Sequence, residues 1–118
     1  WLRRLQKHVD ADDADAQFQL AVVHQNGLMG LEKSPKRAFQ YLELAAAQRH
    51  ATAEFQIGQI YWHGEGVNID KKQAAQWYRR AAEQGYPHAQ RNLGLMFDQG
   101  EGVAQSDEEA ARWWRLAA

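Results

Sequence analysis

The sequence predicts an all-α fold, a solenoid in which helix-turn-helix repeats stack along the chain. Residues 53–67 align with residues 89–103, which lie 36 positions later, and a looser copy of the pattern begins at residue 16. Each copy holds two stretches whose apolar residues recur with the spacing of an amphipathic helix. Because a helix of about 13 residues is marginal alone in water, we expect neighbouring repeats to bury their apolar faces against one another.

The segment before the first repeat has a character of its own. Trp1-Leu2-Arg3-Arg4-Leu5 is similar to Trp77-Tyr78-Arg79-Arg80-Ala81. Residues 1–13 therefore predict the tail helix of a preceding repeat, followed by an extended acidic connector. We expect a fragment of a longer array, with repeats at residues 14–50, 51–86 and 87–118, the last of them truncated.

The first helix of each repeat is expected to end at a glycine. In the second repeat Ala53, Ile57 and Ile60 share one face of this helix. Gly58 lies beside them and allows a neighbouring helix to approach closely. A glycine that accepts the left-handed backbone of a helix end follows in all three repeats, as Gly27, Gly64 and Gly100.

The second helix of each repeat is expected to begin at a capping residue. Ser34 precedes Pro35, and proline is favoured at the first helical position. Asp70 occupies the same place in the second repeat, while Ser106 and Glu109 match a capping box in the third. Three large rings of these helices are expected in the core, namely Trp77, Trp113 and Trp114.

Composition limits the classes of function. The chain has 14 basic and 15 acidic residues among 118, so it lacks the positive field that nucleic acid selects for. No apolar run is long enough for membrane insertion, and we expect a soluble domain. The sequence contains no cysteine, which excludes a disulfide framework and a thiol nucleophile and leaves the compartment open between cytoplasm and periplasm.

Residues 53–85 resemble the Sel1-like repeat, a relative of the tetratricopeptide repeat, at every position of its pattern from Ala53 to Gly85. The first repeat departs from this pattern with Ala21 for glycine, His24 for tyrosine and Arg49 for the closing glycine. The resemblance implies a right-handed superhelix whose first helices line a concave side. It also implies adaptor or scaffold work of the kind common in bacterial relatives.

Carrying over the tetratricopeptide geometry predicts which side chains face that concave side. Trp62 is the first candidate for binding, because it lies outside the packing stripe and tryptophan often dominates binding energy; packing on an adjacent repeat is the alternative. Phe18 and Phe55 also suit a structural role. The predicted partner-binding residues are Phe18, Val22, Gln25, Phe55, Gln59, Trp62, His63, Arg91, Leu95 and Asp98.

The sequence predicts neither a metal nor a cofactor site. No two of the five histidines have the i, i+4 spacing of a helical chelate. The acidic run that begins at Asp10 fails as a calcium loop, since Asp15 and Ala21 stand where glycine and glutamate belong. The only serines are the predicted caps Ser34 and Ser106, so we expect no catalytic centre.

These observations favour a protein-interaction module that holds a partner protein or peptide in its concave groove, without catalysis. A purely structural spacer within a longer repeat array is the alternative. A more remote one is a binder or enzyme for cell-wall or β-lactam-type ligands, like disulfide-rich relatives of the repeat, but this chain has no cysteine.

Overall fold

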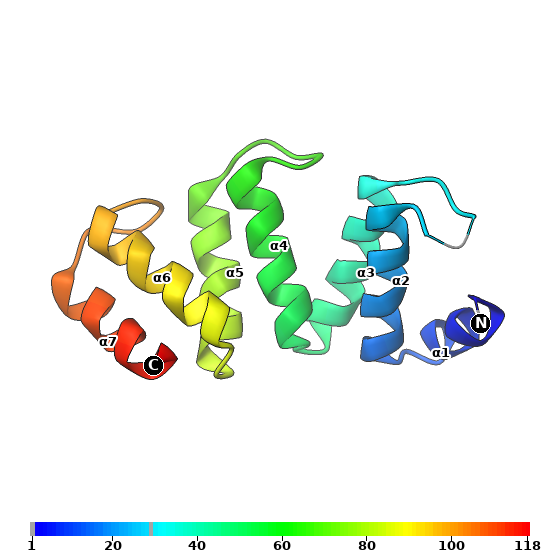
Figure 1. Ribbon diagram of the computed structural model, residues 1–118, viewed down its shortest axis with the longest axis horizontal. Helices are drawn as coiled ribbons and strands as arrows, with labels where there is room; N and C mark the ends of the chain where they lie inside the picture. Colours follow the sequence, from blue (N-terminus) through cyan, green and yellow to red (C-terminus); the bar gives the residue numbers. More distant parts are fainter. Residues whose placement is uncertain (1, 29) are drawn as a thin grey trace. The chain divides into compact units, whose positions relative to one another are not determined.

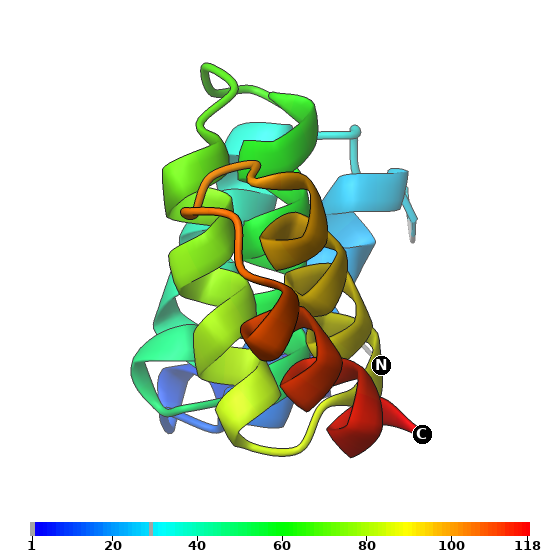
Figure 2. The same cartoon turned by 90° about the vertical axis from the view of Figure 1, so that its left-hand side faces the viewer.

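The structure, a computed structural model, describes residues 2–28 and 30–118. These residues form helices and connecting turns, with no strand among them, and helices next to each other in sequence pack together, as α1 with α2 and α6 with α7. Figures 1 and 2 show α6 and α7 side by side. The predicted all-α fold is confirmed. The helices are α1 (Leu2–Asp10), α2 (Ala14–Asn26), α3 (Pro35–Ala47), α4 (Ala51–His63), α5 (Lys71–Glu83), α6 (Pro87–Gln99) and α7 (Asp107–Ala117).

The chain divides into two compact units, Trp1–Ala53 and Glu54–Ala118, here named unit 1 and unit 2. The boundary falls within the first turn of α4. Unit 1 contains α1, α2 and α3, and unit 2 contains most of α4 together with α5, α6 and α7. Each unit has its own buried apolar cluster, so each is described by itself.

In unit 1 one apolar cluster forms where α1 lies against α2, and α3 packs on α2 as well. Leu5 and Val9, one turn apart on α1, pack against Leu20 and Val23 of α2. This packing keeps α1 helical as far as Asp10, and only three residues then separate it from α2. The prediction of an extended connector is therefore wrong, because residues 11–13 form a tight turn. Trp1, which was expected in this helix, lies outside the described residues.

Two acidic residues shape this turn. Asp12 adopts a left-handed backbone with φ of 60°. Asp13 accepts a hydrogen bond from the backbone N–H of Ala16 at 3.1 Å and so caps α2. Asp12 thus helps to reverse the chain through its backbone conformation, and the Asp13 carboxylate begins the next helix.

The core of unit 2 surrounds Tyr78 of α5, which is 1% exposed. A Cβ atom on Gly58 would lie 2.7 Å from the Tyr78 ring, so glycine is needed there for the close approach of α4 and α5. Gly94 has the same relation to Trp114, at 2.5 Å. Trp114 is nevertheless 41% exposed, because its ring has α6 on one side and no described helix on the other.

The other two tryptophans of the second helices differ in burial. Trp113 is buried at 3% exposure, as expected. Trp77 is half-buried, with the Arg80 guanidinium 4.6 Å from the centre of its ring. The expectation of a core position is thus confirmed for Trp113, is wrong for Trp114 and is met in part for Trp77.

The predicted caps form in all three repeats. Ser34, Asp70 and Ser106 accept hydrogen bonds from the backbone N–H three residues later, at 3.3, 3.0 and 3.2 Å. Their own N–H groups donate back to carbonyl oxygens of His24, Tyr61 and Phe97, at 2.8 to 2.9 Å. The N–H of Ser106 is therefore already in use, and the reciprocal half of the predicted capping box does not form. We name the backbone bond that Ser34, Asp70 or Ser106 donates to the end of the preceding helix the hairpin bond.

The first helices end as expected. Gly27, Gly64 and Gly100 have φ values of 64°, 74° and 67°, which is left-handed backbone. A side-chain hydrogen bond also joins the end of α3 to α2 and the end of α5 to α4. Gln48 donates to Gln17 at 3.0 Å in unit 1, and Gln84 donates to Glu54 at 2.6 Å in unit 2. These two pairs are 36 or 37 positions apart and repeat the same contact.

Candidate functional site

A cavity of about 290 Å³ opens in unit 2. Its wall combines apolar side chains with amide, hydroxyl and charged groups. Four of its residues, Gln59, Trp62, His63 and Leu95, belong to the partner-binding set that the sequence predicted. The lining residues are Gln59, Trp62 and His63 of α4, Tyr78 of α5, Asn92, Leu95 and Met96 of α6, and Glu101 in the turn after α6.

The spacing of these residues explains why they meet. Gln59, Trp62 and His63 are three and four positions apart, so they share one face of α4. Asn92, Leu95 and Met96 share a face of α6 in the same way. Both faces carry polar and apolar groups, which makes the cavity amphipathic.

Trp62 forms one wall of the cavity. It is half-buried and packs against the apolar cluster of unit 2. The Lys71 ammonium lies 4.9 Å from the centre of its ring, and Lys71 also pairs with Glu101 at 3.4 Å. The cation and its acidic partner hold the ring in place. Trp62 therefore packs against the core of unit 2 and also lines the cavity, and its role in binding stays a prediction.

The polar floor of the cavity is organised by Tyr78. Its hydroxyl donates a hydrogen bond to Gln59 Oε1 at 2.6 Å. Burial raises the pKa of Tyr78 to about 12, and a side-chain hydrogen bond with Asn92 acts in the opposite direction. Tyr78 therefore remains a neutral phenol at physiological pH, and its hydroxyl donates to the Gln59 amide of α4.

Other predicted residues of unit 2 do not line the cavity. Phe55 is 8% exposed and stacks on Tyr86 with 5.0 Å between ring centres, so it has the structural role that the sequence also allowed. Arg91 is exposed and its guanidinium contacts His88 Nδ1. Asp98 is exposed, and its carbonyl oxygen lies 3.5 Å from the Gln105 amide.

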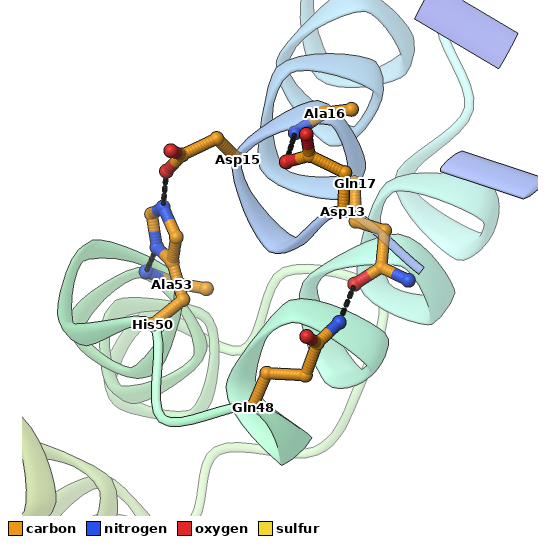
Figure 3. A network of polar contacts seen from close by, with 7 residues as sticks. All are labelled: Asp13, Asp15, Ala16, Gln17, Gln48, His50 and Ala53. Carbon is orange, nitrogen blue, oxygen red and sulfur yellow. Dashed lines mark hydrogen bonds and ion pairs between the residues drawn. The ribbon is translucent and has the colours of Figure 1, made fainter. Parts of the chain in front are cut away.

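The predicted residues of unit 1 lie half-buried on α2. Phe18 stacks on His50, with 4.9 Å between ring centres. His50 Nδ1 accepts the backbone N–H of Ala53 at 3.2 Å, and His50 Nε2 lies 2.9 Å from Asp15 Oδ1 (Figure 3). A histidine therefore caps α4, and Phe18 supports that cap. The remaining two predicted residues are Val22 and Gln25.

His24 stands where the repeat pattern has tyrosine. It is 5% exposed and stacks on Tyr41 with 5.5 Å between ring centres. Burial, and secondarily the charge of Arg37, lowers the pKa of His24 below its ordinary value. The described residues contain no group of three or more histidine, cysteine or acidic side chains placed to hold a metal ion.

Sequence reasoning missed four of the cavity residues, which are Tyr78, Asn92, Met96 and Glu101. One signal for Tyr78 was present. Leu42 and Trp114 stand at the matching positions of the other repeats, so Tyr78 brings a hydroxyl into a stripe expected to be buried. A buried hydroxyl requires a hydrogen-bond partner, which would have directed attention to the amides around it.

The family and the known structures agree with this architecture. The Sel1 repeat matches the chain three times, at residues 14–50, 51–86 and 87–118. A Sel1 repeat protein from Oxalobacter formigenes is 37% identical with a TM-score of 0.93, over 98% of this chain and 86% of that one. A protective antigen of uropathogenic Escherichia coli strains with an SLR fold is also 37% identical with a TM-score of 0.93, over 99% of this chain.

The extent of the similarity differs among the solved structures. This chain spans only 25% of the Escherichia coli antigen. Cysteine rich protein B of Helicobacter pylori shares the fold, with a TM-score of 0.74 and 23% identity over 97% of this chain and 86% of that one. No curated protein sequence matches the chain.

The helices also bear on a membrane role. No helix among residues 2–28 and 30–118 is both long and apolar enough to cross a bilayer.

Repeat signatures cover residues 14–118, and two solved structures at 37% identity superpose on nearly all of the chain. This chain therefore belongs to the Sel1 repeat family.

Proposed function

We propose that the chain is a protein-interaction module, without a catalytic role, that binds a peptide segment of a partner protein at the cavity of unit 2. The observation that carries this proposal is Trp62 on the cavity wall, facing the same space as Leu95, which is 47% exposed. Tryptophan side chains in pockets are over-represented among the residues that dominate protein binding energies. Sel1 repeats generally mediate protein interactions.

The cavity is small, and its volume suits side chains of a bound peptide. Pockets for small ligands usually have about 300 to 1,000 Å³, and this cavity has about 290 Å³. It accommodates one or two side chains of a longer segment. The exposed residues Arg91 and Asp98 on α6 and His63 on α4 are then available for flanking polar contacts.

The test is a selection of random 12-residue peptides displayed on phage against the whole chain. Selected peptides are measured by calorimetry against the unchanged protein, Trp62→Ala and Trp114→Ala. Trp62→Ala is expected to weaken binding by about 30-fold, the equivalent of a hot-spot residue. Trp114→Ala is the matched control, because Trp114 is an exposed ring of unit 2 that does not line the cavity.

The architectural alternative predicts a different result. A spacer would yield no selected peptides, or peptides whose affinity is the same for the unchanged protein and for Trp62→Ala. Either outcome would overturn the proposed function. Circular dichroism of both variants shows whether the helices remain intact.

A further inference from the structure

The hydrogen bond between Tyr78 and Gln59 determines one of the polar groups that the cavity offers to a ligand. The Tyr78 hydroxyl donates to Gln59 Oε1 at 2.6 Å, which leaves the two N–H groups of the Gln59 amide. The side-chain amide of Asn92 lines the same cavity. A carboxamide carries a carbonyl acceptor besides its N–H donors, so Asn92 can offer an acceptor to this space.

Among the described residues, the structure shows no other hydrogen bond for the Gln59 amide nitrogen or the Asn92 carbonyl oxygen. Both residues line the cavity. Helix α4 therefore presents a donor and α6 presents an acceptor to the same space. The buried Tyr78 hydroxyl holds the Gln59 amide in this orientation.

The charges of the cavity are already compensated. Glu101 is the one acidic residue of the lining and pairs with Lys71 at 3.4 Å. Lys71 in turn lies over the Trp62 ring. A charged ligand group would lose hydration here without an unpaired opposite charge to replace it. The cavity therefore favours an uncharged occupant.

A purely aliphatic occupant is also disfavoured. It would contact Trp62, Leu95 and Met96 but leave the Gln59 N–H and the Asn92 carbonyl without partners, which costs about tenfold or more in affinity. A carboxamide accepts from Gln59 and donates to Asn92 at the same time. The methylene groups that carry it can lie against the apolar wall.

We propose that this cavity binds the carboxamide side chain of a glutamine or asparagine in the partner segment. Gln59 donates to the carbonyl of that side chain, Asn92 accepts from its amide nitrogen, and Trp62 covers its methylene groups. The inference rests on the proposed function, because it names the side chain by which a bound peptide is recognised.

The experiment uses three small probes that differ only in the side chain: N-acetyl-glutamine N′-methylamide and the glutamate and leucine analogues. Each is titrated into the ¹⁵N-labelled whole chain and followed by NMR. The glutamine probe is expected to shift the side-chain amide signals of Gln59 and Asn92 and the indole signal of Trp62. Its dissociation constant is expected to be at least about tenfold lower than those of the other two probes.

Two variants separate recognition from folding. Gln59→Glu keeps an oxygen to accept the Tyr78 hydroxyl but removes the free N–H, and it is expected to weaken the glutamine probe by at least about tenfold. Asn92→Leu is expected to do the same by removing the acceptor. Gln19→Leu is the matched control, because Gln19 occupies the position of Asn92 in the first repeat and is exposed. It is expected to leave binding unchanged.

The outcomes distinguish the two proposals. If the leucine or glutamate probe binds as tightly as the glutamine probe, if Gln59→Glu retains affinity, or if the glutamine probe causes no shifts, the carboxamide proposal is wrong. The proposed function survives each of these results as long as selected peptides still depend on Trp62. If those peptides ignore Trp62, the proposed function fails, whichever probe binds.

Discussion

His50 occupies an uncommon position for a histidine, since its ring nitrogen Nδ1 caps the first turn of α4. Nδ1 accepts the Ala53 N–H while Nε2 faces Asp15 and the ring face stacks on Phe18. Nδ1 must be unprotonated to accept, so the proton lies on Nε2 and points to the carboxylate. Asp15 and Phe18 thus fix the tautomer and the orientation that the cap requires.

Replacing His50 by alanine is expected to destabilise the protein by about 1 to 2 kcal/mol, because the Ala53 N–H loses its acceptor. His50→Asn is the matched control, since asparagine is a good helix cap. His50→Asn is expected to destabilise the protein less, because only the stacking on Phe18 is lost. Urea unfolding measures both differences, and equal losses would contradict the capping role of His50.

His24 should make stability depend on pH. Burial and Arg37 lower its pKa in the folded chain, whereas the unfolded chain has the ordinary value of about 6.5. Below that pH the unfolded state binds more protons, so stability is full above about pH 6.5 and falls as the pH decreases further.

The variant His24→Phe, which introduces the residue type found at the matching Phe97, is expected to reduce this loss of stability between about pH 7.5 and pH 5. Melting temperatures measured across this range test it. His8→Phe, at an exposed position of α1, serves as the control and should leave the pH dependence as it is. Parallel curves for the unchanged protein and His24→Phe would contradict the assignment.

Local interactions were predictable from the sequence at the level of single residues. Ser34, Asp70 and Ser106 bond to N–H groups three positions away, so their role depends on nearby residues alone. The Tyr78 bond to Gln59 joins residues 19 positions apart on two helices. Helical periodicity gives the face on which a residue lies, but not the partner that it meets there.

Helix packing in unit 2 depends on two glycines at matching positions of α4 and α6. A Cβ atom on Gly58 would meet the Tyr78 ring, which is 1% exposed, and one on Gly94 would meet the Trp114 ring, which is 41% exposed. The space available to the opposing ring differs, although the glycine contact is the same.

Gly58→Ala is expected to cost about 1 to 3 kcal/mol, because the enclosed Tyr78 ring cannot move aside without disturbing the core. Gly94→Ala should cost less, since the exposed Trp114 ring can rotate away. Denaturant unfolding of the two variants gives the comparison. The packing account would be wrong if Gly94→Ala were the more damaging change.

The same pair of glycines shows how far element-level prediction reached. Gly58 was correctly placed where two helices approach, because its apolar neighbours define the contact face. Trp114 was expected in the core for the same reason, yet it is exposed. Periodicity identifies the face that a helix offers for packing, while burial also requires a second helix to cover that face.

At the scale of the whole molecule, the repeat pattern was sufficient for the all-α fold, since it recurs through three copies of one helix pair. The candidate site was only partly predictable. Gln59, Trp62, His63 and Leu95 were expected on a binding face and do line the cavity. Asn92 was missed although it shares the face of α6 on which Leu95 lies. Glu101 pairs with Lys71 of another element, a contact that a one-dimensional pattern does not contain.

The hairpin bond joins backbone atoms, so no side chain is needed to make it. This is why His24, Tyr61 and Phe97 can all accept it, although their rings differ in size and polarity. The connection between the two helices of a pair therefore sets no requirement on the side chain at the acceptor position. Substitutions there can change the ring while the backbone link between the helices is kept.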